Sequence, residues 1–182
     1  MRSEPTAPGS DDADANDRDR LREKLLEFRS SFASLLMATV NRDGSPEASY
    51  APFVEEGGDF YIYVSELSIH TRNLMDTGRA SVLFIEEETA SRNTFARRRL
   101  TVQCVAREVA RGTPGFDTAL SRFESRFGAL IKTLRGLPDF HLFQLRPGGA
   151  RYVTGFGKAF EIDRLDLAGA RHLKGADLSG ER

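Results

Sequence analysis

The chain has 182 residues, of which 40% are hydrophobic, enough to form the core of one ordinary domain. Its 26 Lys and Arg nearly balance its 27 Asp and Glu, so overall charge indicates neither a nucleic acid nor a membrane surface as a partner. The single cysteine, Cys104, excludes an internal disulfide and a cysteine-based metal cluster. With no recognisable secretory signal and no apolar run of roughly 20 residues, we expect a cytoplasmic protein.

The two ends differ in composition from the middle of the chain. Residues 1–18 are rich in Asp, Pro, Ser and Gly, which predicts a disordered leader because such a segment buries little apolar surface. From about Asp19 the spacing of Leu21, Leu25 and Phe28 predicts a helix packed on the domain. We expect one domain over residues 19–163, followed by a C-terminal tail, residues 164–182.

The middle of the chain combines short strands with two helices. One helix is expected to follow Ser68 and end at Gly78, and a longer apolar-striped helix is expected from Pro114 to Gly136. The predicted strands are 34–40, 46–54, 59–65, 80–86, 100–106, 140–145 and 151–162. Six or seven mostly sequential strands with inserted helices indicate an α+β fold, a split antiparallel β-barrel with peripheral helices, rather than a parallel sheet.

The segment from Ser65 to Asn73 is the most informative for function, because a strand there enters a helix start rich in hydroxyls. A helix N-terminus offers free N–H groups and partial positive charge, so an anion binds there readily. The candidate anion ligands are Ser65, Ser68, Thr71 and Arg72. The alternative is an ordinary helix cap with polar residues facing solvent.

Two further segments could contact the same ligand. Arg99 closes an arginine triplet at the start of a strand, where a guanidinium could bind a phosphate or carboxylate, although charge runs at strand ends are usually solvated. The segment Ser49 to Phe53 contains Pro52, which cannot donate to a sheet hydrogen bond. It is therefore either a site where a flat ring replaces strand pairing or an edge strand protected by proline.

The three histidines, His70, His141 and His172, show no paired metal-ligand spacing. His141 follows Asp139 closely on a predicted strand and is expected to be an outward polar residue. Taken alone, each histidine is more often structural than catalytic.

Several motifs together resemble the haem-utilisation proteins of the HutZ and HugZ type, within the pyridoxamine 5′-phosphate oxidase-like, flavin-binding split-barrel superfamily. The resemblance runs from about Leu25 to His172. The motifs are Ala38-Thr-Val40, Ser49-Tyr-Ala-Pro-Phe53, His70-Thr-Arg-Asn-Leu74, Phe95-Ala-Arg-Arg-Arg-Leu-Thr101, Arg126-Phe-Gly128, Asp139-Phe140, Leu142-Phe143 and Gly155-Phe-Gly-Lys-Ala159.

The resemblance implies a homodimer whose interface holds a planar, anionic redox cofactor, FMN or haem. It places the flavin phosphate near the helix start, and in a flavoprotein we expect the backbone of Ser49 to Ala51 to contact the ring. It also implies that Arg99 lies near haem and that Asp139 polarises a haem-ligating histidine. The implied cofactor-binding residues are Ser49, Tyr50, Ala51, Ser65, Ser68, His70, Thr71, Arg72, Asn73, Arg99 and His172.

The sequence departs from the family at the iron ligand, because Glu181 stands where the family has that histidine. A carboxylate is a poor substitute for imidazole on haem iron, so His172 is the candidate ligand if haem is bound. The leading hypothesis is a dimer that binds or degrades haem in haem utilisation. The alternatives are an FMN-dependent oxidoreductase of unknown substrate and a non-catalytic haem carrier.

Overall fold

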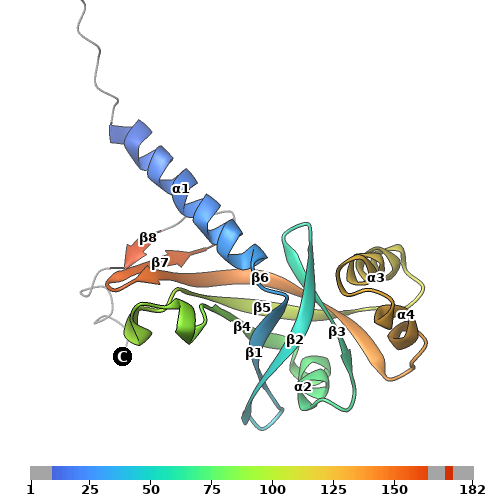
Figure 1. The fold of residues 1–182 in the computed structure, drawn as a ribbon. Helices are drawn as coiled ribbons and strands as arrows, with labels where there is room; N and C mark the ends of the chain where they lie inside the picture. Colours follow the sequence, from blue (N-terminus) through green and yellow to red (C-terminus); the bar gives the residue numbers. More distant parts are fainter. Residues whose placement is uncertain (1–9, 164–170, 174–182) are drawn as a thin grey trace, which may run out of the picture.

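The computed structural model of the chain describes residues 10–163 and 171–173, with side chains described from 17 to 163. Figure 1 shows a β-barrel with helices around it and a long N-terminal helix projecting from one side. The strands are β1 (Ser34–Val40), β2 (Pro46–Glu56), β3 (Asp59–Ser65), β4 (Arg79–Ile85), β5 (Arg99–Val109), β6 (Phe140–Gly155), β7 (Lys158–Ile162) and β8 (Arg171–Leu173). The helices are α1 (Ser10–Ser30), α2 (Ile69–Thr77), α3 (Pro114–Phe127) and α4 (Leu130–Arg135), with short 3₁₀ turns η1 (Glu88–Ala90) and η2 (Thr94–Ala96).

The sheet closes into the predicted antiparallel barrel. Its strand order is β3-β2-β1-β4-β5-β6-β7-β8, and an additional pairing between β3 and β6 closes the ring over six strands. The strands β7 and β8 continue the sheet beyond β6, outside the closed ring. The closing pair leaves neither β3 nor the first half of β6 as a free edge, which is the kind of edge that promotes aggregation.

Strand β6 is one long strand where two were expected. Its first half pairs with β3, from Phe140 opposite Ser65 to Leu145 opposite Phe60, and its second half pairs with β7. The break expected after Leu145 is wrong, because Pro147 lies opposite Cys104 at an irregularity in the β5–β6 register. A bulge accommodates a proline without ending the strand. The glycine break was expected correctly, since Gly157, at a φ of 69°, lies in the tight turn before β7.

Strand β2 explains the position of Pro52. It lies between β1 and β3, so it is not an edge strand along its whole length. Pro52 pairs with Ser34 of β1, whereas pairing with β3 begins only at Phe53. The first half of β2 therefore has one unpaired edge, and α2 lies against this part of the barrel, contacting both β1 and β2. A covering helix is one way in which proteins protect such an edge.

The helices differ from their expected limits at two places. The α1 helix begins at Ser10, so the expected leader is helical from there, and residues 1–9 lie outside the described part of the chain. The sequence did not predict this extension because residues before Leu21 lack apolar periodicity. Once the later part of the helix is anchored on the barrel, however, each further helical residue costs little free energy. The single helix expected over 114–136 is two helices, since Gly128 adopts a φ of 77°. Within the described residues, no helix is long and apolar enough to cross a membrane.

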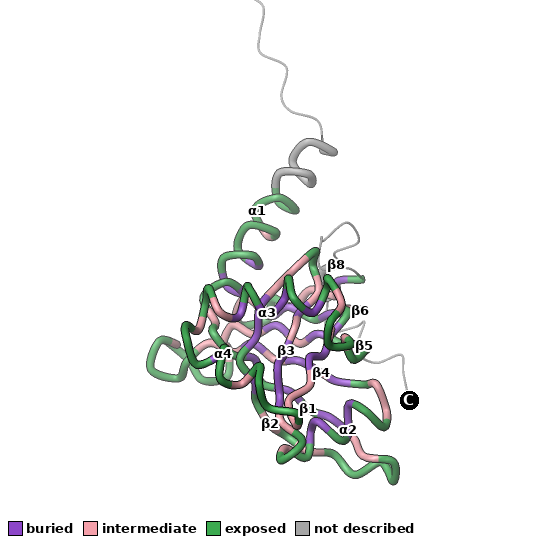
Figure 2. The backbone as a smooth tube through the Cα atoms, turned by 90° about the vertical axis from the view of Figure 1, so that its right-hand side faces the viewer, coloured by how far each residue is buried: buried purple, intermediate pink, exposed green. Residues whose placement is uncertain are grey.

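The core forms two clusters, and the buried backbone in Figure 2 follows the barrel strands. The larger cluster fills the barrel, where the ring centroids of Phe53, Phe60 and Phe84 lie 5.4–5.8 Å apart. The second cluster packs α3 and α4 against β3 through Phe123 and the ring of Tyr63. The barrel is therefore filled by side chains, which leaves its outer surfaces and helix ends to carry function.

The left-handed backbone conformation of Gly78, at the end of α2, can be tested by substitution. Gly78 has a φ of 63°, and a Cβ there would lie 3.3 Å from the carbonyl oxygen of Ala106. We expect Gly78→Ala to lower the free energy of unfolding by about 1–3 kcal/mol, because the residue would be strained and crowded. Urea denaturation measures this change. Gly115→Ala is the control, with an ordinary φ and a nearest neighbour at 3.9 Å, and it should stay within about 0.5 kcal/mol of the parent.

Candidate functional site

One apolar surface of the barrel is exposed to solvent. It lies on the outside of β2, β1, β4 and β5, and a continuous row crosses it, pairing Tyr50 with Leu36, Leu36 with Leu83, and Leu83 with Thr101. Tyr50 is 65% exposed and Leu36 is 45% exposed. We call this surface the outer sheet face; its members are Leu36, Ala38, Ala48, Tyr50, Pro52, Leu83, Thr101 and Val105. An exposed apolar patch of this kind is typical of a binding surface.

The three cofactor-binding residues predicted on β2 do not share one side of the strand. Tyr50 points to the outer sheet face, whereas Ser49 and Ala51 point to the other side, as the alternation of a strand requires. The Ser49 hydroxyl oxygen is buried and has no hydrogen-bond partner among the described residues. Of the three side chains, only that of Tyr50 faces a ring lying on the outer sheet face, so the predicted contacts of Ser49 and Ala51 with such a ring would be made by their backbone.

The turn before α2 is joined to the start of β6. Ser65 Oγ donates a 2.7 Å hydrogen bond to Oδ2 of Asp139, and it also accepts one from the Leu67 amide at 3.1 Å. The Glu66 amide donates to the Asp139 carbonyl oxygen at 2.8 Å. The candidate catalytic carboxylate and the first candidate anion ligand are therefore direct neighbours, a contact set by the β3–β6 pairing and invisible in the sequence.

The predicted anion ligands of α2 divide into inward and outward residues. Thr71 is fully buried, and its hydroxyl donates to the Ser65 carbonyl oxygen at 2.6 Å. Asn73 is buried and donates to Thr39 Oγ1 at 3.0 Å. Ser68 makes no side-chain cap bond, and the exposed Arg72 has no hydrogen bond or ion pair with another described residue. Ser68, Arg72 and the helix N-terminus are thus the groups best placed for an incoming anion.

His70 is buried in the first turn of α2 and faces the protein. Burial lowers the pKa of its imidazole, and the opposing effect of Glu47 does not offset this, so the ring is neutral at pH 7. Its Nε2 atom, like Ser49 Oγ, is buried without a partner among the described residues. Two unpaired polar atoms at the junction of β2 and α2 fit a site that is completed by a ligand or a second subunit.

Arg99 lies away from the α2 start within one chain. It begins β5, and its guanidinium donates to the Arg97 carbonyl oxygen at 3.1 Å. Arg99 pairs with Val153 of β6, whereas Ser65, at the turn before α2, pairs with Phe140 at the other end of the same strand. The thirteen residues from Phe140 to Val153 span about 43 Å of strand. A single small ligand therefore cannot readily contact both Arg99 and the α2 start of the same subunit.

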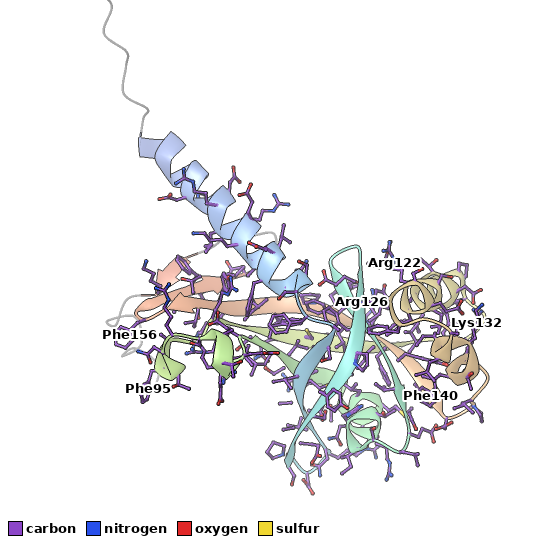
Figure 3. All side chains as sticks on the ribbon, viewed as in Figure 1. Phe95, Arg122, Arg126, Lys132, Phe140 and Phe156 are labelled. Carbon is purple, nitrogen blue, oxygen red and sulfur yellow. The ribbon has the colours of Figure 1, made fainter. Side chains whose placement is uncertain are left out.

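Three aromatic or titratable residues were given no role from the sequence but stand out in the structure. Phe95 of η2 and Phe156 of the β6–β7 turn are 88% and 82% exposed, at the end of the molecule opposite Lys132 of α4 (Figure 3). His141, expected to be simply an outward residue, contacts two carboxylates, Glu66 and Glu108. Exposed aromatic residues could have been suspected from their motifs, whereas the histidine contacts depend on the barrel closure.

The iron-ligand question concerns the C-terminal part of the chain. His172 lies on β8, a strand that was not predicted, where it pairs with Phe160 of β7. This places its backbone on the sheet extension beyond β6. Glu181 lies outside the described residues, and the expected tail is described only from 171 to 173.

Cys104 belongs to the hydrophobic core of the barrel. It is buried, and burial raises the pKa of its thiol to about 12. The thiolate that nucleophilic or metal-binding cysteines need is therefore not populated at neutral pH.

Comparison with known proteins agrees with the barrel fold. Residues 21–154 match the model of a family described as pyridoxamine 5′-phosphate oxidase. Over 155 residues the chain is 37% identical to a Vibrio cholerae protein named heme oxygenase HutZ, covering 85% of this chain and 88% of that protein. A solved structure of Vibrio cholerae HutZ, described as a heme storage protein, superposes with a TM-score of 0.69 at 36% identity, over 72% of this chain and 93% of that one. The structure of Campylobacter jejuni ChuZ superposes with a TM-score of 0.78 at 33% identity, over 90% of this chain and 66% of that one.

Proposed function

Because this chain belongs to the pyridoxamine 5′-phosphate oxidase family, whose barrel it folds into, we propose that it is a cytoplasmic haem-utilisation protein that binds haem between two subunits. The observation that carries the proposal is its 37% identity, over most of both chains, to a protein named a heme oxygenase. The outer sheet face supports the proposal, since a flat apolar macrocycle needs such a surface.

The separation between Arg99 and α2 is the argument for a dimeric site. If both contact one ligand, they come from different subunits, because about 43 Å of β6, from Phe140 to Val153, separates the residues with which Ser65 and Arg99 pair within one chain. In an isologous dimer each residue pair is used twice, which produces two equivalent sites. The outer sheet face, exposed and apolar, supplies the surface on which the two subunits would meet.

The haem propionates would be held by Ser68 and Arg72 at the start of α2. Asp139 would orient a histidine on the iron, in the role that the family gives it. The candidate is His172 of the partner subunit, because within one chain the β6–β7–β8 register places His172 beside Tyr152, far along β6 from Asp139. Haem supplies redox and oxygen chemistry when it is bound. The chain's own contribution is to hold the macrocycle, bind the carboxylates and keep water away from one of its faces.

A flavin-dependent oxidoreductase is the second candidate, favoured by the family's description as an oxidase. The same helix start would bind the FMN phosphate, and Tyr50 would contact the ring. Hemin and FMN have different absorption spectra, so one set of titrations with the two ligands tests both functions.

The test is a hemin and FMN titration of the parent protein and of Arg72→Ala. We expect the variant to weaken hemin binding by roughly tenfold, because a charge-assisted hydrogen bond contributes about 1.5–3 kcal/mol and Arg72 is partly solvated. Lys132→Ala, which removes an exposed cation of α4, is the control and should bind like the parent. Equal affinities for all three proteins would remove Arg72 from the site.

Turnover separates degradation from storage. Incubation of the hemin complex with ascorbate should yield biliverdin-type products if the protein degrades haem. Intact haem after incubation, with tight binding, would leave a carrier and refute the oxygenase role.

A further inference from the structure

One histidine is held between two carboxylates from two other elements. His141, near the start of β6, has Nε2 at 2.7 Å from Glu66 Oε1 and Nδ1 at 2.7 Å from Glu108 Oε1. Glu66 belongs to the turn after β3, and Glu108 belongs to the end of β5, the two strands that flank this half of β6. The ring is 18% exposed, so the contacts are partly shielded from water.

The geometry defines the protonation state of the ring. A carboxylate accepts hydrogen bonds, so both ring nitrogens must carry protons for both contacts to form, and His141 is then a cation. Partial burial lowers the pKa of the imidazole, but the hydrogen bonds and charges of Glu108 and Glu66 outweigh it and leave the pKa above its ordinary value. These two carboxylates are the charged groups that act on the ring from the neighbouring elements; Asp139, which lies just before β6, is bound instead by Ser65.

The bridge ends in the turn that carries the candidate anion site. The turn runs from Ser65 to Ser68, where the Ser68 amide donates to the Ser65 carbonyl oxygen at 3.1 Å. The Glu66 amide is bound by the Asp139 carbonyl oxygen, so backbone and side chain of Glu66 are both tied to β6, through Asp139 and His141. The position of α2's N-terminus depends on this turn.

We propose that His141 is a positioning residue: by bridging Glu66 to Glu108 across β6 it holds the Ser65–Ser68 turn in its anion-binding shape and offsets carboxylate charge beside the site. This inference rests on the proposed function only for the identity of the anion, a haem propionate or a flavin phosphate. The bridge itself exists without ligand and is tested without one.

The sign of the pH dependence follows from the charges. Two carboxylates and one imidazolium carry a net charge of −1, and loss of the proton leaves −2 beside the anion site. The stabilisation from the raised pKa is fully present below the unfolded-state pKa of histidine and is lost as pH rises through the folded-state pKa. Anion binding should weaken over the same interval. The effect of one partly screened charge is about three- to fivefold in the dissociation constant.

The first experiment uses nitrogen-detected NMR of the histidine ring in the ligand-free full chain. We expect both ring nitrogens of His141 to be protonated at pH 6, as its two carboxylate contacts require, and its pKa to lie above that of an exposed histidine. Glu108→Gln should lower this pKa, and Glu23→Gln, which changes an exposed carboxylate of α1, should leave it unchanged. A neutral ring with an ordinary or lowered pKa would overturn the proposal, whatever the protein binds.

The second experiment measures hemin dissociation constants and the Glu66 and Leu67 amide signals at pH 6 and pH 9, for the parent and for His141→Gln. Between pH 6 and pH 9 the hemin dissociation constant of the parent should rise about three- to fivefold more than that of the variant. Its turn amides should shift with pH, and those of the variant should not. The same pH profile in both proteins would refute the positioning role. If the parent binds no hemin or FMN at all, the proposed function fails, and the amide signals still decide the role of His141.

Discussion

Replacing Leu36 with glutamate should convert the proposed dimer to monomers and abolish the proposed tight hemin binding. Leu36 is 45% exposed at the centre of the outer sheet face, between Tyr50 and Leu83. In a two-fold interface the substitution places two carboxylates in one apolar contact, and unpaired charges there cost several kcal/mol. We expect the dimer dissociation constant to rise on the order of 100-fold or more. Light scattering coupled to size exclusion measures the mass.

Leu130→Glu is the matched control, because Leu130 is a 63% exposed leucine of α4 and lies outside the outer sheet face. It should leave both mass and hemin affinity unchanged. The dimer on this face is refuted if the parent is monomeric with hemin bound, or if Leu36→Glu stays dimeric at micromolar concentration.

Phe84→Ala should have the largest effect on stability among the single substitutions considered. Phe84 is 1% exposed, and its ring centroid lies 5.5 Å from that of Phe32, 5.4 Å from Phe53 and 5.6 Å from Phe60. Truncation leaves a cavity among rings that belong to β2, β3 and the α1–β1 connection. Because these rings are held by separate elements, they cannot move together to fill the cavity. Loss of a buried phenylalanine lowers the free energy of unfolding by about 3–5 kcal/mol. Urea denaturation with an unchanged slope measures it.

Phe95→Ala removes the same side chain from a position that is 88% exposed. It should change the free energy of unfolding by no more than about 0.5 kcal/mol. A small loss for Phe84→Ala, close to that of Phe95→Ala, would contradict the packing of the barrel interior described above.

The barrel was predictable because its strands carry local signals. The limits of β1 and β3 agree with the predicted 34–40 and 59–65, where apolar alternation and flanking turn residues coincide. The left-handed Gly78 at the end of α2 was likewise predictable from the helix pattern. Such signals depend on residues close in sequence, so they can be recognised before the strand pairing is known.

The candidate site was predictable only in part. The alternation of β2 could have shown that Ser49 and Ala51 point away from Tyr50. The contact of Ser65 with Asp139, across 74 positions of sequence, depends on the β3–β6 pairing and has no local signal. The same pairing brings Glu66 to His141, so both contacts could be found only after the barrel had closed.

The most direct measurement is the absorption spectrum of the purified protein before and after hemin is added. We predict that the protein acquires a sharp Soret band at one hemin per subunit, and that the band position changes in His172→Ala. Flavin bands in the purified protein, with no specific Soret shift on hemin addition, would contradict the haem-binding function and establish the flavoprotein alternative.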